Sequence, residues 1–501
     1  MSLHLPAGSI GPNDPAYDYW NNRSVNLQFI SKPGLIIPVR TDAELLDTIQ
    51  WAVNQQSYFV IRGGGHCLED FVGNPEVQVI IDISQLKGIR YDPERKAIEV
   101  RAGNTLGEVQ SFLADQWNVL LPAGEHPDIG IGGHIQGGAF GFLCREHGLG
   151  ADYLYAVEVI HIDRNGKTVT STATRDADDP NRELWWAFTG GGAGNFGTVT
   201  RFWFRDPACT VDDPARMLPQ IPEFIETIEL EWLWPSLNED NFRQLLSVFG
   251  NWCRDHSVAG TTGASVFATL HIFSEAVGKI QLKGLLTDPK GEPALDLLLA
   301  LFDAIPVTFT RSRNKLPWLR FTLNPFPDIF TDARAAFRGK DAFLEQPWSE
   351  TQLGTIYEQM TRKGLPGGFI GMASYGGKVN TVEPAATASV QRKAIMTTAC
   401  AVGWMDPADR DESYRWVRGC YAELYKMTGG APVPNGRTGG CIIAHPDREL
   451  ADPDLNRSGV PWYEFYYQSN YKRLQAVKAE WDPLDIYHHS LSVQLPGSID
   501  Q

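Results

Sequence analysis

The sequence has few cysteines and no long apolar stretch, and each absence excludes a class of protein. Seven cysteines are scattered along 501 residues without a CxxC spacing, so neither a disulfide framework nor a structural zinc site is expected. No apolar run approaches the ~20 residues that a membrane-spanning helix needs. The first residues lack the basic and then apolar build of a secretory signal. We therefore expect a cytoplasmic protein, with secretion after removal of a signal peptide as the alternative.

Basic residues are outnumbered by acidic ones, which limits the partners of the chain. The formal net charge is −16, which argues against nucleic acid and against anionic membrane surfaces as partners. A chain of 501 residues, 43% of them hydrophobic, exceeds what one hydrophobic core usually supports. We therefore expect two domains that act on a small molecule.

The most informative segment that is present lies at residues 58–66, Tyr-Phe-Val-Ile-Arg-Gly-Gly-Gly-His. An apolar run of strand type ends at Arg62, three glycines follow, and His66 closes the turn. Glycine has no Cβ, so the backbone can adopt a positive φ and approach a ligand closely. Successive amide groups in such a turn form a concavity suited to phosphate. A plain tight turn beside a surface histidine is the alternative.

Two further glycine-rich segments follow. Residues 130–141 contain six glycines in twelve positions, and residues 190–197 read Gly-Gly-Gly-Ala-Gly-Asn-Phe-Gly. The second segment satisfies the GxGxxG pattern, but a helical pattern precedes it and a strand-like alternation follows it. A Rossmann turn needs the opposite order. Three glycine-rich segments at which the backbone can approach a ligand closely therefore indicate one large cofactor that carries phosphate. They do not indicate a Rossmann-type nucleotide site.

Together these segments carry a family resemblance. Residues 62–66, 122–141 and 190–197, and the C-terminal Tyr-Tyr-Gln-Ser-Asn-Tyr-Lys-Arg-Leu of residues 466–474, resemble the FAD-linked oxidases of the vanillyl-alcohol-oxidase superfamily. Within that superfamily they are most similar to the berberine-bridge-enzyme-like branch. The resemblance is dense over residues 30–205 and good over residues 436–493, whereas the middle of the chain matches by length and position only.

The resemblance implies an α+β fold with two domains. An FAD-binding domain of the PCMH type would span residues 1–205, and an antiparallel-sheet substrate domain covered by helices would span residues 206–444. The C-terminal segment, residues 445–501, would return to the FAD domain.

Residue patterns predict individual elements inside this frame. Capping residues and apolar periodicity predict helices, and alternation predicts strands. Helices are expected at residues 41–54, with Thr41 or Asp42 as N-cap, and at 106–116, 242–252 and 294–302. Strands are expected at residues 77–83, 97–102 and 264–273, and a hairpin is expected to join 157–162 to 168–171.

For the cofactor, the resemblance implies FAD bonded covalently through His66 to the 8α-methyl carbon of the isoalloxazine ring. The redox chemistry then belongs to FAD, and the protein supplies orientation, electrostatics and a base. The other positions that the resemblance assigns to the cofactor are Arg62, Gly63, Gly64, Gly65, Cys67, His126, Ile129, Gly130, Gly132, Gly133, His134, Gly137, Gly138, Gly141, Gly194, Asn195, Gly197, Tyr467 and Asn470.

The chain departs from the family pattern near His126. Many members attach the flavin a second time through a cysteine in a Gly-x-Cys-Pro-x-x-Gly segment, where this chain reads Gly-Glu-His-Pro-Asp-Ile-Gly at residues 124–130. A second, cysteinyl link is therefore not expected. Three readings of His126 stay open: it lies at the flavin edge, it tunes the flavin potential, or it contacts the substrate. A bond through its nitrogen would be unusual. A metal site at His126 and His134 is not expected, because the sequence has no carboxylate at a spacing that would complete the set of ligands.

A second departure concerns the catalytic base. The branch commonly places a tyrosine in an Asn-Tyr-x-Asp segment, where this chain reads Ala-His-Pro-Asp at residues 444–447. His445 therefore occupies the base position, and a histidine can accept a proton near neutral pH. The alternative is that the base is lost. The resemblance gives Tyr375 a substrate-facing role that assists the base, with plain packing as its alternative. The adjacent pair His488 and His489 is interpreted as a surface pair.

Three functions are compatible with these residues. The first is an oxidase that passes hydride from a substrate C–H bond to FAD and then to O₂, giving H₂O₂. Its substrate would be a secondary-metabolite alcohol or phenol, or a carbohydrate. The second is a dehydrogenase with another electron acceptor, and the third is a non-redox cyclase or binding protein. In the family, the residue at the position of Ile129 controls the access of dioxygen to the flavin: valine tends to permit it and leucine tends to block it. Isoleucine is β-branched like valine but as large as leucine, so this position does not decide between the two. We expect an oxidase, and the sequence does not name its substrate.

Overall fold

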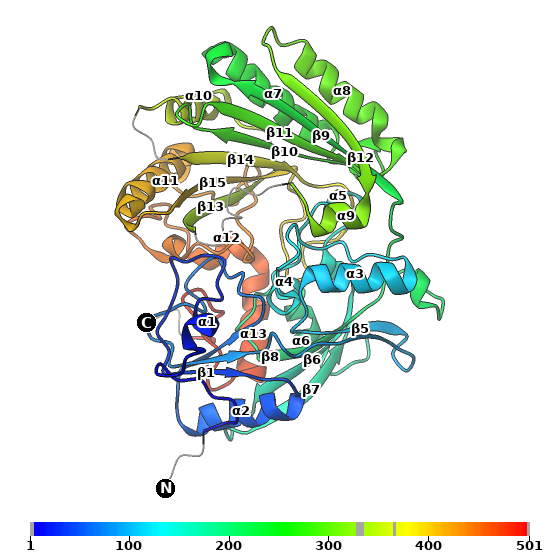
Figure 1. The fold of residues 1–501 in the computed structure, drawn as a ribbon, viewed down its shortest axis with the longest axis vertical. Coiled ribbons are helices and arrows are strands. Elements are labelled where there is room, and N and C mark those ends of the chain that lie inside the picture. Colours follow the sequence, from blue (N-terminus) through cyan, green and yellow to red (C-terminus); the bar gives the residue numbers. More distant parts are fainter. Residues whose placement is uncertain (1–4, 327–334, 364–366, 498–501) are drawn as a thin grey trace.

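The computed structural model describes residues 5–326, 335–363 and 367–497 of the chain. Its strands form three sheets (Figure 1). A small parallel sheet has the order β1 (Leu35–Pro38), β3 (Val79–Asp82), β2 (Phe59–Arg62). An antiparallel sheet has the order β4 (Ile89–Asp92), β5 (Ala97–Arg101), β8 (Thr198–Phe204), β6 (Leu154–Ile162), β7 (Thr168–Thr174).

The third sheet is larger and antiparallel throughout. Its order is β12 (Thr310–Pro317), β9 (Phe224–Leu233), β11 (Lys279–Leu286), β10 (Val266–Phe273), β14 (Gly368–Ser374), β15 (Met396–Trp404), β13 (Ala336–Leu344). Together, the three sheets and the helices around them confirm the predicted α+β fold with an antiparallel substrate-domain sheet.

Helices near the two smaller sheets come from both ends of the chain. They are α1 (Tyr17–Asn21), α2 (Asp42–Asn54), α3 (Leu106–Trp117), α4 (Ile131–Gln136), α6 (Arg182–Ala187), α12 (Trp462–Tyr466) and α13 (Tyr471–Trp481). The short helix α5 (Cys144–His147) lies nearer the large sheet (Figure 1). The C-terminal helices lie in the lower part of the molecule, below the seven-stranded sheet (Figure 1). Phe465, Leu474 and Leu491 accordingly share one buried core with residues of α2, α3 and β6. The proposed boundaries at residues 205 and 444 stay a prediction.

The seven-stranded sheet has a helix-covered face and a face toward the rest of the molecule. Residues of α7 (Glu239–Asp255), α8 (Glu292–Asp303), α10 (Glu350–Met360) and α11 (Arg410–Leu424) pack with alternate strand residues in one core. The opposite face supplies Phe267, Phe343 and Tyr375 to a second core, which also contains Phe142 and, from α9 (Trp318–Leu323), Phe321. The sheet therefore separates the layer of covering helices from the layer that faces α4 and α5.

Local signals in the sequence explain several element boundaries. The Thr41 hydroxyl accepts a hydrogen bond from the amide of Glu44 and caps α2, as predicted, and Thr105 caps α3 in the same way. The predicted hairpin is present as β6 and β7, with the Asp163 carboxylate accepting from the amide of Lys167 in the turn. All seven cysteines are free thiols. None of the helices in the described ranges combines the length and apolar character that crossing a bilayer requires.

Candidate active site

The glycine turn that follows β2 is anchored at its first residue. The Arg62 guanidinium is buried and pairs with Asp82 at the end of β3, with 2.7 Å between Nε and Oδ2. Beyond Arg62, a Cβ on Gly64 would stand 2.3 Å from the backbone nitrogen of Gly130. A Cβ on Gly65, whose φ is +78°, would stand 2.4 Å from the carbonyl oxygen of Arg23. Only glycine allows this turn and the segment at residue 130 to touch backbone to backbone.

The same turn offers unused backbone donors. In the described part of the chain, the amides of residues 63–66 donate no hydrogen bond to another protein group. A Cβ built on Gly63 or on Gly133 would meet nothing within 4 Å, so both glycines border open space. Backbone amides without partners around open space are what a phosphate-bearing cofactor requires. The residues present therefore fit the predicted cofactor.

The second glycine segment joins this turn to the C-terminal segment. A Cβ on Gly137 would stand 2.9 Å from the Cβ of Ala444, directly before His445. Gly138, at φ +101°, lies against Ser389. The other predicted glycines of this segment are also close approaches: Gly132 lies against the carbonyl of Ala102, and Gly141 lies against the backbone of Gly124. Ile129 is half-buried and packs against the main core between these contacts.

The third glycine segment is shaped from behind by polar side chains. Asn195 is buried, and its Nδ2 donates to the carbonyl oxygens of Gly191 and Gly192 at 3.1 Å each. The Tyr467 hydroxyl donates to the carbonyl oxygen of Gly191 at 3.0 Å. Asn470 Nδ2 donates to the carbonyl oxygens of Pro384 and Thr387. Tyr467 and Asn470 therefore hold the backbone of neighbouring loops. Gly194 and Gly197 have φ values of +78° and +140°, which explains the need for glycine at both positions.

His489 corrects the interpretation of the C-terminal histidines as a surface pair. His488 is exposed, whereas His489 is half-buried, with its ring 3.8 Å from that of Phe71. Its Nε2 lies 3.2 Å from the carbonyl oxygen of Ala193, beside Gly194. The polar character of the pair gave no signal for this, because the neighbours of His489 come from distant parts of the sequence.

Two of the predicted histidines lie together at the glycine turn. The ring centroids of His66 and His126 are 5.1 Å apart. Burial, aided by the neighbouring His126 and opposed by Asp128, lowers the pKa of His66 to about 4. His134 has a buried Nε2 without a hydrogen-bond partner in the described residues. Burial, aided by His445 and His66, lowers the pKa of His134 to about 3. His66 and His134 are therefore neutral at pH 7, and each has one ring nitrogen with a free lone pair.

His445 has different surroundings. Its side chain is 47% exposed, and its Nδ1 lies 3.5 Å from Oδ2 of Asp341, which is buried in β13. Burial lowers the pKa of His445, but the hydrogen bond and charge of Asp341 and the charge of Glu125 outweigh it, so the pKa lies above its ordinary value. Sequence reasoning missed Asp341, because nothing in the local pattern links a strand carboxylate to a histidine about a hundred positions later.

Tyr375 and Cys67 complete the predicted set. Tyr375 is 1% exposed, and its ring packs against those of Phe140 and Phe343, which corresponds to the packing alternative. Burial raises the pKa of its hydroxyl well above the ordinary value. The Cys67 thiol lies 3.3 Å from the carbonyl oxygen of Glu69, and burial raises its pKa to about 12. At pH 7 neither group is ionised.

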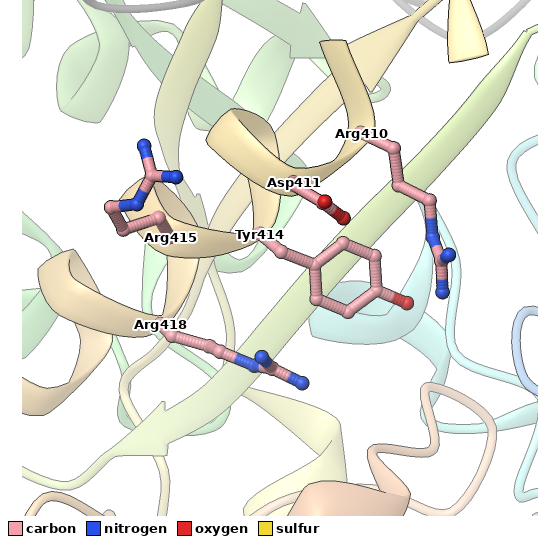
Figure 2. Close-up of a pocket in the computed structure, with 5 residues that line it drawn as sticks. All are labelled: Arg410, Asp411, Tyr414, Arg415 and Arg418. Carbon is pink, nitrogen blue, oxygen red and sulfur yellow. The ribbon is translucent and has the colours of Figure 1, made fainter. Parts of the chain in front are cut away.

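A separate pocket of about 400 Å³ lies at α11, outside this constellation. Figure 2 shows the Tyr414 ring between the side chains of Arg410 and Arg418. Arg418 is already paired with Glu449, at 2.6 Å, and neighbouring Arg448 with Asp70, also at 2.6 Å. None of the residues that line this pocket belongs to the predicted site. In the described ranges, no three histidine, cysteine or carboxylate side chains gather so as to hold a metal ion.

Comparison with known proteins identifies the cofactor. The family described as "FAD binding domain" matches residues 33–172, and the family described as "Berberine and berberine like" matches residues 448–494. An aclacinomycin-N/aclacinomycin-A oxidase of Streptomyces galilaeus is 42% identical over 97% of this chain and 89% of its own. The chain belongs to the berberine-bridge-enzyme-like FAD-linked oxidoreductases. It is an FAD-dependent oxidoreductase of the oxidase type.

Solved structures agree with this assignment. A crystal structure of aclacinomycin oxidoreductase superimposes with a TM-score of 0.95 at 40% identity, covering 98% of this chain and 100% of its own. A glycopeptide hexose oxidase complexed with teicoplanin superimposes with a TM-score of 0.92 at 38% identity, covering 98% and 100%. Both matches cover nearly the whole chain, so this FAD-linked oxidoreductase has the fold of both.

Proposed function

We propose that this enzyme removes hydride from a C–H bond of a carbohydrate, or of an alcohol or phenol of a secondary metabolite, and that O₂ is its electron acceptor. The observation that carries the proposal is the position of His445, an exposed imidazole that follows directly on the contact between Ala444 and the glycine segment. When bound, FAD supplies the acceptor for the hydride, and dioxygen takes the electrons to give hydrogen peroxide.

His445 is the proposed base for this reaction. Its Nδ1 faces Asp341, so its Nε2 is free to take the proton of the substrate hydroxyl as the hydride leaves the adjacent carbon. For His126 and Tyr375 we propose supporting contacts to substrate or cofactor, because His126 is next to His66 and Tyr375 belongs to the core against which Ala444 packs.

His66 is the proposed point of covalent attachment of FAD. Because its pKa is about 4, its ring is neutral at neutral pH and one ring nitrogen keeps a free lone pair, which a bond to the 8α carbon requires. The thiol of Cys67 stays protonated, with a pKa of about 12. These two properties support a single histidyl link without a cysteinyl one.

The experiment that tests this function is a substrate screen under two atmospheres. Glucose, lactose, teicoplanin and aclacinomycin A serve as probes, because relatives of this chain are named for hexose, glycopeptide and aclacinomycin oxidation. The proposal predicts that one class bleaches the flavin colour without air, and that admitting air restores the colour and releases peroxide. Bleaching that air does not reverse, with rapid reduction of a quinone dye, would instead show a dehydrogenase. Product formation without any bleaching would show a non-redox enzyme.

A further inference from the structure

Asp341 lies where the sheet faces the site. It belongs to β13, the edge strand that pairs with β15, and its side chain is 6% exposed. Side chains alternate along a strand, so Asp341 shares a face with Phe343, whose ring lies 5.0 Å from that of Tyr375. The carboxylate therefore points to the layer between the sheet and the glycine segments, not to the helices that cover the other face.

The main chain of Asp341 is held firmly, whereas its carboxylate has no donor at close hydrogen-bond distance. Its carbonyl oxygen accepts hydrogen bonds from the Tyr421 hydroxyl at 2.8 Å and from the Cys441 thiol at 3.3 Å. Neither carboxylate oxygen has a hydrogen-bond partner of good geometry within the described residues. A buried carboxylate without a donor is costly. Two titratable donors face it: Nδ1 of His445, at 3.5 Å, and the thiol of Cys441, which lowers the pKa of Asp341 less than His445 does and whose own pKa is raised by burial, so that it stays neutral.

We infer that Asp341 is the positioning residue of His445: its carboxylate accepts a hydrogen bond from the Nδ1–H group, so that the lone pair of Nε2 is directed toward the substrate. The inference rests on the proposed function of His445. A hydrogen bond at one ring nitrogen fixes the tautomer and the orientation of the other. When Nε2 takes the substrate proton, the imidazolium keeps its Nδ1 proton and its charge faces the Asp341 carboxylate.

The other charged groups around the pair do not replace Asp341. Glu125 also faces His445 but acts more weakly than Asp341. His134, with a pKa of about 3, is neutral and contributes no charge at pH 7. Burial raises the pKa of Asp341 and the nearby Asp447 adds to this, whereas His445 lowers it. The carboxylate and the imidazole therefore each favour the ionised form of the other.

The test is the pH dependence of diethyl pyrocarbonate modification at His445 in the holoenzyme. The reagent acylates unprotonated imidazole, and mass spectrometry of the His445 peptide measures the extent. In the wild type we expect a midpoint above the ordinary value of about 6.5. Asp341→Asn removes the charge with little change of shape and should lower the midpoint by about one pH unit. At any pH below the midpoints of both proteins, His445 in Asp341→Asn should then be modified roughly tenfold faster than in the wild type.

Two further variants separate a positioning role from a structural one. Asp341→Glu retains the charge and should return the midpoint toward the wild-type value. Asp128→Asn is the matched control, because Asp128 acts on His66, and it should leave the His445 curve unchanged.

The same midpoint in the wild type and in Asp341→Asn would overturn the inference. A wild-type midpoint at or below about 6.5 would overturn it as well, so the result does not depend on the folding of any variant. The assay needs no substrate. The proposed function can fail separately. If His445→Ala still reduces its flavin at the normal rate while Asp341→Asn shifts the modification curve of His445, then His445 is not the base but its pairing with Asp341 is confirmed.

Discussion

Three histidines of one site differ in protonation because their neighbours differ. His66 and His134 are half-buried, and burial is the main cause that lowers their pKa values to about 4 and about 3. His445 faces a buried carboxylate, which raises its pKa. The residue with the lowered pKa suits attachment to a cofactor, and the residue with the raised pKa suits proton transfer near neutral pH.

His445→Ala should slow anaerobic flavin reduction by about 10²–10⁴-fold, the usual contribution of a general base. Stopped-flow absorbance with the substrate found in the screen measures this rate. His488→Ala is the matched control, because His488 is exposed and its ring stacks on Tyr58, away from the predicted base. A reduction rate that His445→Ala leaves unchanged would move the role of base elsewhere, with Tyr375 as the next residue to test.

The pH dependence of flavin reduction follows from the same residue. A base acts in its unprotonated form, and the pKa of His445 is raised. The reduction rate should therefore rise with pH through a midpoint above about 6.5 and level off beyond it. Stability changes with pH in the opposite direction to the reduction rate. Protonated His445 pairs with Asp341 and stabilises the fold at pH values below the ordinary pKa of histidine. This stabilisation is lost as the pH rises through the raised pKa of His445. A flat profile from pH 6 to 9 would contradict the assignment.

At the scale of elements, backbone contacts between glycines bring the turn after β2 to the start of α4. Gly64→Ala should therefore destabilise the protein, because the added Cβ would lie 2.3 Å from the Gly130 nitrogen and 2.8 Å from the Asp128 carbonyl oxygen. Overpacking of this kind costs roughly 1–3 kcal/mol, measured by denaturant unfolding without added FAD.

Gly63→Ala is the control for this substitution, since its Cβ would meet nothing within 4 Å of the protein. It should leave the unfolding free energy within about 0.5 kcal/mol of the wild type and reduce only FAD incorporation, measured by flavin absorbance per protein. Equal destabilisation by the two substitutions would show that the backbone contact at Gly64 has no special importance.

Elements with local signals could be predicted from the sequence, and contacts between distant segments could not. Thr41 marks the start of α2, and the turn residues near Asp163 predict the hairpin. The glycine segments predicted close backbone approach, because glycine has no Cβ and is the residue that such contacts require. Asp341 and His489 were missed or misread, since their partners His445 and Phe71 lie far away in the sequence and neither position has a distinctive local pattern.

At the scale of the whole molecule, a network of buried charges joins three distant segments. Arg338 on β13 pairs with Glu69, beyond the glycine turn, at 2.5 Å, and with Asp447, beyond His445. Lys340 on the same strand pairs with Asp447 at 2.6 Å and with Glu449 at 2.8 Å. All five side chains are buried. The edge of the large sheet is thereby tied to the turn that carries His66 and to the segment that carries His445.

Arg338→Met should destabilise the protein by about 3–5 kcal/mol, because it leaves Glu69 and Asp447 buried without their common partner. Denaturant unfolding of the holoenzyme measures the change. Arg311→Met is the matched control, since Arg311 forms an exposed pair with Asp303, and such pairs contribute about 1 kcal/mol or less. Similar unfolding midpoints for the two variants would show that the buried network does not hold the segments together.

The central claim is that one FAD is bonded to the protein through His66, and acid precipitation with peptide mass mapping tests it most directly. The account predicts a yellow pellet from the wild type, with one FAD adduct on the peptide that contains His66 and none on the peptide that contains His126. It also predicts a colourless pellet from His66→Ala, with the flavin in the supernatant. A colourless wild-type pellet, or covalent flavin that persists in His66→Ala, would contradict the account.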